Sequence, residues 1–399
     1  MKILFLSTMD FAPWGGSEAL WSQCAQYALK KKHNVTVCVK HWGTKESSNI
    51  VLVKDLGAKI IYRDEPEVNI IRPTWHDIIR FRLRKHLGII ITPKKIQTEP
   101  LSLQEKLGLD YDVVCVSQGA AYDMVLKNDI FIYLNSLKAT FVSLTQFNYD
   151  YGFSLNETII KKARIVFEKA KLNLFVAKSN LNSVEHQIAK PLNNCEVINN
   201  PLNLSDTSYI EYPDDKTIVF ACVSRLYCKT KAIDILIGVL GGSNWMNRDW
   251  ILNIYGKGED EFFLRELIKK HNLENKVFIK GHVKNIDAIW ETSNILILPS
   301  IFEGTPISLH EAMLKGRACI TTHVAGITEY VINDVNGFIS PSPNYFYLSK
   351  TLEKAWSKKR DWSTMGLSAR GSLLKQIDLT PEKTLLEYLL ITSSQSQNE

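Results

Sequence analysis

The amino-acid sequence predicts an α/β protein made of two doubly wound domains that face each other. Short apolar runs alternate with stretches of helical periodicity, which is the pattern of a parallel sheet with crossover helices. The alternation stops near residue 204 and begins again after residue 216. The chain of 399 residues is long enough for two domains of ordinary size.

The first half of the chain alternates predicted strands and helices. The predicted strands are residues 3–7, 35–39, 59–62, 113–117, 141–145 and 174–177. Helices are predicted between them, for example at residues 18–31 and 159–171. Residues 204–216 contain Asp, Ser, Thr and Pro and lose the periodicity, so we expect an interdomain linker there.

The second half repeats the same pattern. The predicted strands are residues 218–223, 251–255, 277–280, 295–299 and 318–321, with helices at 232–239 and 261–271. Residues 381–390 are predicted to be a helix, followed by a polar tail at 393–399. We therefore expect domains at 1–203 and 204–378, with 379–399 forming a C-terminal helix and tail that pack back on the first domain.

The composition is that of a globular protein, with 45% hydrophobic and 23% charged residues. A net charge of +6 suits anionic partners such as nucleotides, phospholipid surfaces or nucleic acid. The seven cysteines form no C-x-x-C pair and lie mostly in apolar runs, which indicates a reduced compartment. No run reaches the roughly 18 apolar residues of a membrane span, so we expect a cytoplasmic protein.

The strongest motif of the second half is a predicted strand, turn and helix over residues 299–313. Thr305 suits the N-cap of this helix, and Pro306 suits its first position. The N–H groups of Ile307, Ser308 and Leu309 would then lie free at the positive end of the helix dipole. Such an end, at the carboxyl edge of a parallel sheet, predicts an anion site.

Two acids, Glu303 and Glu311, bracket this predicted anion site. An acid on each side of a phosphate site suits a ligand that carries hydroxyls at both ends of a diphosphate, as a nucleotide-sugar does. The alternative is an ordinary capped helix with two solvated glutamates.

The segment resembles the signature of the retaining glycosyltransferases of family four, which are group 1 glycosyltransferases of the GT-B fold. That signature is a Glu, seven further residues and a second Glu, and Glu303 and Glu311 have this spacing. The resemblance implies two facing Rossmann-like domains with a central cleft. It also implies that Glu303 holds the hydroxyls of the donor sugar, that Glu311 holds the ribose, and that the backbone from Gly304 and Thr305 onward meets the sugar and the diphosphate.

Further blocks resemble the same family in the same order. Arg225 and Lys231 resemble the Arg and Lys that neutralise the departing diphosphate, with Lys229 as a rival for the Lys. Gly256 and Gly258 resemble the glycine turn after the next strand, and residues 325–329 and 336–338 resemble the end of the donor domain. A solvated rim and a plain turn are the alternatives for the charged pair and the glycines.

In the first half, Gly15 and Gly16 follow the first predicted strand and allow the backbone to approach a ligand closely. They resemble the glycine loop of the family, which closes over the donor and borders the acceptor; a plain turn is the alternative. The pattern G-x-G-x-x-G is absent, which disfavours nicotinamide binding. Where the family usually has a His, this sequence has Gln146, followed two residues later by Asn148, and both are acceptor-side candidates.

The sequence offers no evident metal site. Asp110 and Asp112 have the D-x-D spacing of metal-using transferases, but they precede a strand and so lie at the amino edge of the sheet. The nine histidines show no paired ligand spacing. We therefore expect no cofactor and no metal, with the nucleotide-sugar as co-substrate.

Residues 72–95 hold seven Lys or Arg residues and one acid, Asp77. Trp75, Ile79, Leu83 and Leu87 recur at four-residue spacing, so this stretch predicts a basic amphipathic helix. Such a helix lies either on its own domain or on anionic lipid at the inner face of a membrane. No module for nucleic acid is recognised.

The resemblance implies an enzyme, a hexosyltransferase-like glycosyltransferase that takes a sugar from a nucleotide-sugar and retains its anomeric configuration. Its acceptor would be a glycan or glycolipid, in the biosynthesis of a surface polysaccharide. Two alternatives stay open: a nucleotide-sugar epimerase on the same fold, and a non-catalytic GT-B subunit that binds a partner enzyme or a glycan.

Overall fold

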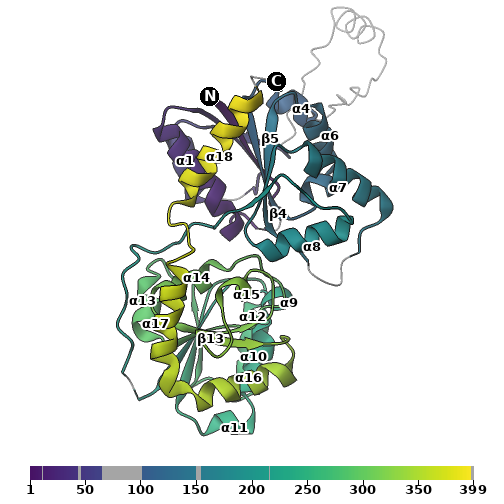
Figure 1. The fold of residues 1–399 in the computed structure, drawn as a ribbon. Coiled ribbons are helices and arrows are strands. Elements are labelled where there is room, and N and C mark those ends of the chain that lie inside the picture. Colours follow the sequence, from purple (N-terminus) through teal and green to yellow (C-terminus); the bar gives the residue numbers. More distant parts are fainter. Residues whose placement is uncertain (11, 44–45, 65–100, 150–153, 215, 397–399) are drawn as a thin grey trace, which may run out of the picture.

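The computed structural model describes residues 1–10, 12–43, 46–64, 101–149, 154–214 and 216–396. They form two parallel α/β domains, drawn one above the other in Figure 1. This is the predicted architecture. The basic stretch of residues 72–95 lies outside the described residues.

The first domain contains a parallel sheet of seven strands in the order β3-β2-β1-β4-β5-β6-β7. The strands are β1 (Lys2–Ser7), β2 (Asn34–Val39), β3 (Lys59–Tyr62), β4 (Val113–Ala120), β5 (Thr140–Phe147), β6 (Leu172–Phe175) and β7 (Cys195–Val197). Side chains alternate between the faces, so Ile3 and Phe5 join one hydrophobic cluster and Leu4 and Leu6 the other. A core therefore lies on each face of this sheet.

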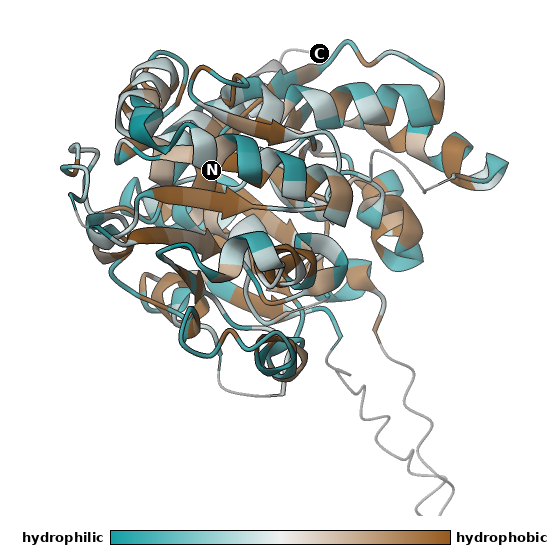
Figure 2. Ribbon diagram, turned by 90° about the horizontal axis from the view of Figure 1, so that it is seen from below, coloured by the Kyte–Doolittle hydropathy of each residue, from teal (hydrophilic) through white to brown (hydrophobic). Residues whose placement is uncertain are grey.

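Helices cover both faces of the first sheet, as apolar strands in a parallel sheet require. They are η1 (Gly16–Glu18), α1 (Ala19–Lys30), α2 (Ser48–Asp55), α4 (Leu103–Leu107), α5 (Asp123–Leu126), α6 (Asn128–Ser136), α7 (Glu157–Lys169) and α8 (Lys178–Ile188). In Figure 2 the strands are mostly brown, and the helices around them carry teal turns, so the hydrophobic sequence is concentrated in the sheets.

The second domain contains a parallel sheet of six strands in the order β10-β9-β8-β11-β12-β13. The strands are β8 (Ile218–Val223), β9 (Trp250–Tyr255), β10 (Val277–Gly281), β11 (Ile295–Leu298), β12 (Ala318–Thr322) and β13 (Gly337–Ser340). Its helices are α9 (Cys228–Lys231), α10 (Ile233–Leu240), α11 (Ser243–Met246), α12 (Glu261–Lys270), α13 (Asp287–Thr292), α14 (Ile307–Leu314), α15 (Ile327–Tyr330), α16 (Tyr345–Ser357), η2 (Lys359–Asp361) and α17 (Trp362–Leu373).

The last helix, α18 (Pro381–Ser396), returns to the first domain and lies beside α1 (Figure 1). Leu385, Leu386 and Leu389 are buried in the cluster formed by β1, β2 and α1. The helix is longer than predicted: Ser393, expected in a polar tail, is 5% exposed, and its hydroxyl lies 3.7 Å from the sulfur of Met1.

The segment that joins the domains, residues 199–214, has no helix or strand and runs along the second domain. Arg317, which is fully buried, donates to the carbonyls of Ile210 and Glu211 at 2.9 and 2.8 Å. The predicted linker is thus irregular but held against the second domain, because its carbonyl groups accept hydrogen bonds from the buried guanidinium of Arg317.

The two domains touch where the carboxyl ends of their strands come together. A Cβ atom on Gly304, in the loop after β11, would lie 2.0 Å from the carbonyl oxygen of Gln146 at the end of β5. The Thr305 hydroxyl donates to the carbonyl of Val176, just beyond β6, at 2.8 Å. Glycine at position 304 is therefore required by the contact between the domains.

Among the described residues, no helix is long and apolar enough to cross a membrane.

The C-terminal helix should contribute to the stability of the first domain. Leu389→Ala should lower the free energy of unfolding by about 2–5 kcal/mol, because it opens a cavity in a packed cluster. Ile391→Ala is the matched control, since Ile391 lies on the same helix but is 54% exposed, whereas Leu389 is 0% exposed. Denaturant unfolding measures both, and equal losses would contradict the packing of α18 on this domain.

Candidate functional site

The candidate site is the loop after β11 and the first turn of α14. Pro306 is the N-cap of α14, and helix geometry begins at Ile307, one residue later than predicted. Thr305 does not cap the helix, because its hydroxyl is used between the domains. The prediction that the Leu309 N–H lies free was also wrong, because this N–H donates to the carbonyl of Pro306 at 3.1 Å. The predicted site thus retains the first-turn amides of Ile307 and Ser308, for which a helix has no carbonyl partner of its own.

The helix start is held against the neighbouring strand. The Ser308 hydroxyl donates to the carbonyl of Val223, the last residue of β8, at 2.9 Å. Gly316, with φ of +76°, follows the C-cap Lys315, and a glycine suits this left-handed position at a helix end. The positive end of α14 therefore lies beside the carboxyl end of β8, as an anion site in such a fold requires.

Lys231 and Glu303 form an ion pair beside the start of this helix. Lys231 Nζ lies 2.6 Å from Glu303 Oε1, and the Ser300 hydroxyl donates to the same oxygen at 2.7 Å. The side chains are 19% and 9% exposed, so the pair is largely shielded from water. The fold thus brings together two predicted site residues that are 72 positions apart.

The two other candidate cations lie more openly. Arg225 is exposed, and its guanidinium carbon lies 5.5 Å from the ring centre of Tyr227. Lys229 is exposed at the same short helix, α9, whereas Lys231 reaches Glu303. Of the two rival lysines, Lys231 is therefore the one that the structure places against the acid.

The glycines after β9 are required by close packing. A Cβ atom on Gly256 would lie 1.9 Å from the carbonyl oxygen of Ser224, and one on Gly258 would lie 2.2 Å from that of Leu226. Gly256 also has φ of +144°. These contacts hold the β8 and β9 loops together, so the glycines have a structural reason that is independent of any ligand.

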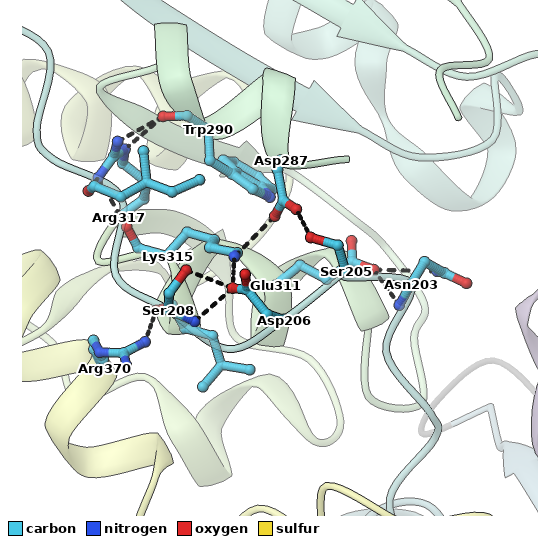
Figure 3. Close-up of polar contacts among 12 residues, drawn as sticks. Asn203, Ser205, Asp206, Ser208, Asp287, Trp290, Glu311, Lys315, Arg317 and Arg370 are labelled. Atoms are coloured by element: carbon cyan, nitrogen blue, oxygen red, sulfur yellow. Dashed lines mark hydrogen bonds and ion pairs between the residues drawn. The ribbon is translucent and has the colours of Figure 1, made fainter. Parts of the chain in front are cut away.

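Glu311, on α14, is buried and fastened to the linker (Figure 3). Its Oε1 accepts from the backbone N–H of Asn203 at 3.0 Å and from the side-chain amide of Asn203 at 3.1 Å. Burial raises the pKa of the Glu311 carboxyl to about 6, and the two bonds from Asn203 act in the opposite direction. Sequence reasoning missed Asn203, because no motif or spacing links it to Glu311.

The glycine loop of the first domain reaches the same helix start. A Cβ atom on Gly16 would lie 3.4 Å from Cδ1 of Ile307, and Gly15 is the extended residue before η1. Gly16 therefore borders the start of α14, whereas a Cβ atom on Gly15 would meet Met9 and Ser17 of its own loop. The loop leads into Glu18, which sequence reasoning did not select although it directly follows Gly15, Gly16 and Ser17.

A pocket opens beside the glycine loop, at the carboxyl ends of β1, β2 and β3. Trp14, Trp42 and Tyr62 line it, together with Glu18. Glu18 is 5% exposed, and its carboxylate accepts from the Ser7 hydroxyl at 2.8 Å. Burial raises the pKa of Glu18 to about 7, while the bond from Ser7 acts to lower it.

The two acceptor-side candidates, Gln146 and Asn148, are buried near the end of β5 and bond to the linker and to α8. Gln146 is 5% exposed, and its Oε1 accepts from Asn200 of the linker at 2.8 Å. Asn148 is 1% exposed and donates to Gln187 on α8 at 2.8 Å. Gln146 therefore connects the end of β5 to the linker, and the buried amide nitrogen of its side chain donates no hydrogen bond to the described part of the chain.

A further acid, Glu329 on α15, joins the domains near the site. Its carboxylate accepts from the backbone N–H groups of Lys178 and Ser179, at 3.2 and 2.9 Å, in the first turn of α8. A carboxylate at a helix N-terminus is stabilising because it meets free amides and the positive end of the dipole.

The D-x-D residues lie where the sequence placed them, at the amino edge of the first sheet. Asp112 accepts from the backbone N–H of Lys2 at 2.7 Å, and Asp110 pairs with the Lys2 ammonium. Within the described ranges, no three His, Cys, Asp or Glu side chains are grouped so as to hold a metal ion.

Comparison with known proteins supports the motifs. Residues 210–370 match the family model described as "Glycosyl transferases group 1". An uncharacterised glycosyltransferase of Haemophilus influenzae is 30% identical over 162 residues, covering 40% of this chain and 45% of the relative. A poly(ribitol-phosphate) alpha-N-acetylglucosaminyltransferase of Staphylococcus aureus is 28% identical over 173 residues, covering 43% and 34%. The matched part thus spans less than half the length of these relatives.

Solved structures resemble the whole chain. HepE of Anabaena, in complex with UDP, has a TM-score of 0.69 at 17% identity and covers 98% of this chain and 99% of its own. TarM has a TM-score of 0.66 at 13% identity, covering 98% of both chains. Over residues 210–370 the chain is therefore similar to the group 1 glycosyltransferases, and as a whole it has the GT-B fold.

The buried carboxyl of Glu18 should make stability depend on pH. Its pKa is about 7 in the folded protein and near 4.5 when exposed, so the unfolded chain loses this proton first as the pH rises. The contribution of Glu18 to the free energy of unfolding should thus fall between pH 4.5 and 7, by up to about 3 kcal/mol.

Glu18→Gln retains an acceptor for Ser7 but cannot ionise. The free energy of unfolding of this variant minus that of wild type should therefore be larger at pH 8 than at pH 5, which means that the variant is relatively more stable at pH 8. Urea unfolding at the two pH values measures this difference, and a difference that does not change with pH would refute the raised pKa of Glu18.

Proposed function

We propose that the protein is a retaining glycosyltransferase that moves a sugar from a nucleotide-sugar to a glycan or glycolipid. The observation that carries this proposal is the Lys231–Glu303 pair beside the amides at the start of α14. One cation, one helix end and one acid supply a charge for the diphosphate and an acceptor for the hydroxyls of a sugar.

In the proposed reaction, the bond between the anomeric carbon and the diphosphate oxygen breaks, and a bond to an acceptor hydroxyl forms on the same face. The hydroxyl proton passes to the departing diphosphate, so no protein base is needed at Gln146. Lys231, Arg225 and the amides of α14 stabilise the negative charge of the leaving group, which is commonly the largest contribution to catalysis. Glu303 orients the sugar, and Glu311 holds the ribose.

This chemistry requires no metal ion in our proposal, since cationic side chains and a helix end would face the diphosphate. The nucleotide-sugar is a co-substrate, and no other cofactor is proposed. UDP is the natural first probe, because HepE of Anabaena was solved with UDP and with UDP-glucose.

The acceptor is proposed to enter beside the glycine loop. Trp14 and Trp42 offer aromatic faces there, and the ammonium of Lys40 lies 4.8 Å from the Trp42 ring centre. Flat aromatic surfaces with a nearby acid, Glu18, suit a sugar ring with its hydroxyls. The relatives named for poly(ribitol-phosphate) and diphosphoundecaprenol acceptors support a glycan or glycolipid of a cell surface. The basic stretch of residues 72–95 supports contact with an anionic membrane.

The rival with the most specific support is a subunit that works only with a partner. Two streptococcal relatives are named as the GtfA subunit of a peptide N-acetylglucosaminyltransferase. Purified chain alone, given a nucleotide-sugar and candidate acceptors, tests this: transfer without a second protein supports the proposal. Sugar conversion in the absence of any acceptor would indicate an epimerase instead.

Glu303 and Glu311 should fail in different ways. Glu311→Gln removes a charge-assisted bond to ribose, worth about 1.5–3 kcal/mol, so UDP should bind roughly tenfold or more weakly. Glu303→Gln acts at the sugar end and releases Lys231, so UDP should bind as well as before or more tightly. It should lower kcat/KM strongly, because the placement of the sugar governs the geometry of attack.

Isothermal titration of UDP against each variant measures the contrast. Glu291→Gln is the control, since Glu291 is an exposed acid on α13. If Glu303→Gln and Glu311→Gln weaken the binding of UDP equally, the two acids do not act at opposite ends of the donor.

A further inference from the structure

We propose that Asn203, in the linker between the domains, is a positioning residue that holds Glu311 ready for the ribose of the donor. This inference rests on the proposed function, because it assigns Glu311 to the nucleotide. It adds a residue outside every motif of the sequence, and it gives the linker a part in substrate recognition.

The first argument is the geometry of the contact. Asn203 directs two N–H groups, one from the backbone and one from the side chain, at the same oxygen of Glu311, at 3.0 and 3.1 Å. Among the described residues, no hydrogen bond reaches the other oxygen, Oε2. Two donors on one oxygen fix the plane of the carboxylate and leave the second oxygen for a ligand.

The second argument is that Asn203 covers a group that is costly to bury. Glu311 is 2% exposed, whereas Asn203, which bonds to one of its oxygens, is exposed, so the linker lies on one side of this carboxylate. An ionised carboxylate at such a depth needs hydrogen-bond donors, and Asn203 supplies them without adding a charge. A lysine there would pair with Glu311 and compete with a ligand, whereas an amide does not.

The third argument is that the linker is fixed on both sides of Asn203, and Figure 3 shows the contacts of Ser205 and Asp206 that follow it. Leu202 and Leu204 pack against the hydrophobic cluster under α14. Beyond them, the Ser205 hydroxyl donates to Asp287, and Asp206 lies 3.1 Å from the buried ammonium of Lys315. Lys315 also lies 2.9 Å from Asp287, so a small ionic network holds this irregular segment of the linker against the second domain.

These contacts make Asn203 preorganised, because its backbone is held whether or not a ligand is present. A carboxylate with a fixed plane loses less conformational freedom when it accepts from ribose hydroxyls than a freely rotating one. The effect should therefore be seen in the part of the binding free energy that comes from the ribose hydroxyls, and less in the part from the diphosphate.

The test compares UDP with 2′-deoxy-UDP by isothermal titration. The ratio of their dissociation constants reports the contact to the 2′-hydroxyl alone, since both ligands share the base, the 3′-hydroxyl and the diphosphate. In wild type the deoxy compound should bind several-fold to tenfold more weakly. Asn203→Ala should reduce this ratio to less than half of its wild-type value, and Asn203→Asp, which keeps the size but faces Glu311 with a second acid, should reduce it further.

Ser208→Ala is the matched control, because it removes a hydrogen bond within the same linker, from the Ser208 hydroxyl to Asp206, without touching Asn203 or Glu311. It should leave the ratio at the wild-type value even if the melting temperature falls. A wild-type ratio in both Asn203 variants would overturn the inference and leave Asn203 a merely structural residue.

The proposed function fails in a different way. If wild type binds no UDP, or if Glu311→Gln keeps the full preference for ribose, then the assignment of Glu311 is wrong and not only that of Asn203.

Discussion

The close contact between Gly304 and the carbonyl of Gln146 determines how the two domains meet. A side chain at Gly304 would begin 2.0 Å from that oxygen and 2.8 Å from Cγ2 of Val176, so only glycine permits this approach. The neighbouring Thr305 then reaches the carbonyl of Val176, and the N–H of Gly326 donates to the carbonyl of Gly304 at 3.0 Å. Glu329 adds the bonds to the first turn of α8.

The contact between the domains lies next to the residues of the candidate site. The loop that carries Gly304 also carries Glu303, so the contact that joins the domains sets the position of the acid that pairs with Lys231. The glycine loop of the first domain meets Ile307 at the start of the same helix. A donor bound there would touch groups from both domains, and its binding would depend on their relative position.

Buried charge explains why the linker is ordered. Arg317 is fully buried, and burial lowers its pKa to about 10. Its guanidinium donates to carbonyls of Trp290, Ser293, Ile210 and Glu211, two of which belong to the linker. Without them the charge would lack partners, which is costly inside a protein. The linker is therefore part of the second domain along much of its length.

Much of the fold was predictable, because apolar runs with crossover helices have few other solutions. The predicted strands 59–62 and 218–223 agree with β3 and β8 to the residue. The short strand β7 was missed, because two of its three residues are exposed and it has no apolar run. Strand β13 was seen only as a family motif, since a Gly and a Ser bound its two apolar residues.

The site was predictable where it depends on local sequence and not where it depends on tertiary contact. Helix α14, Glu303 and Glu311 follow from one motif, and Lys231 from another. Thr305 was wrongly expected as a cap, because its hydroxyl meets a carbonyl of the other domain that the sequence cannot place beside it. The same holds for the bonds from Asn200 to Gln146 and from Asn203 to Glu311, whose partners are 54 and 108 positions apart.

The central claim is that the start of α14, with Lys231 and Glu303, is where a nucleoside diphosphate binds. Hydrogen–deuterium exchange with and without UDP tests it directly, peptide by peptide. The account predicts slower exchange in residues 223–231 and 301–311 when UDP is present, with no change in residues 243–250 at the far end of the second domain. Protection that is absent from both predicted segments, or that is found only elsewhere, would contradict it.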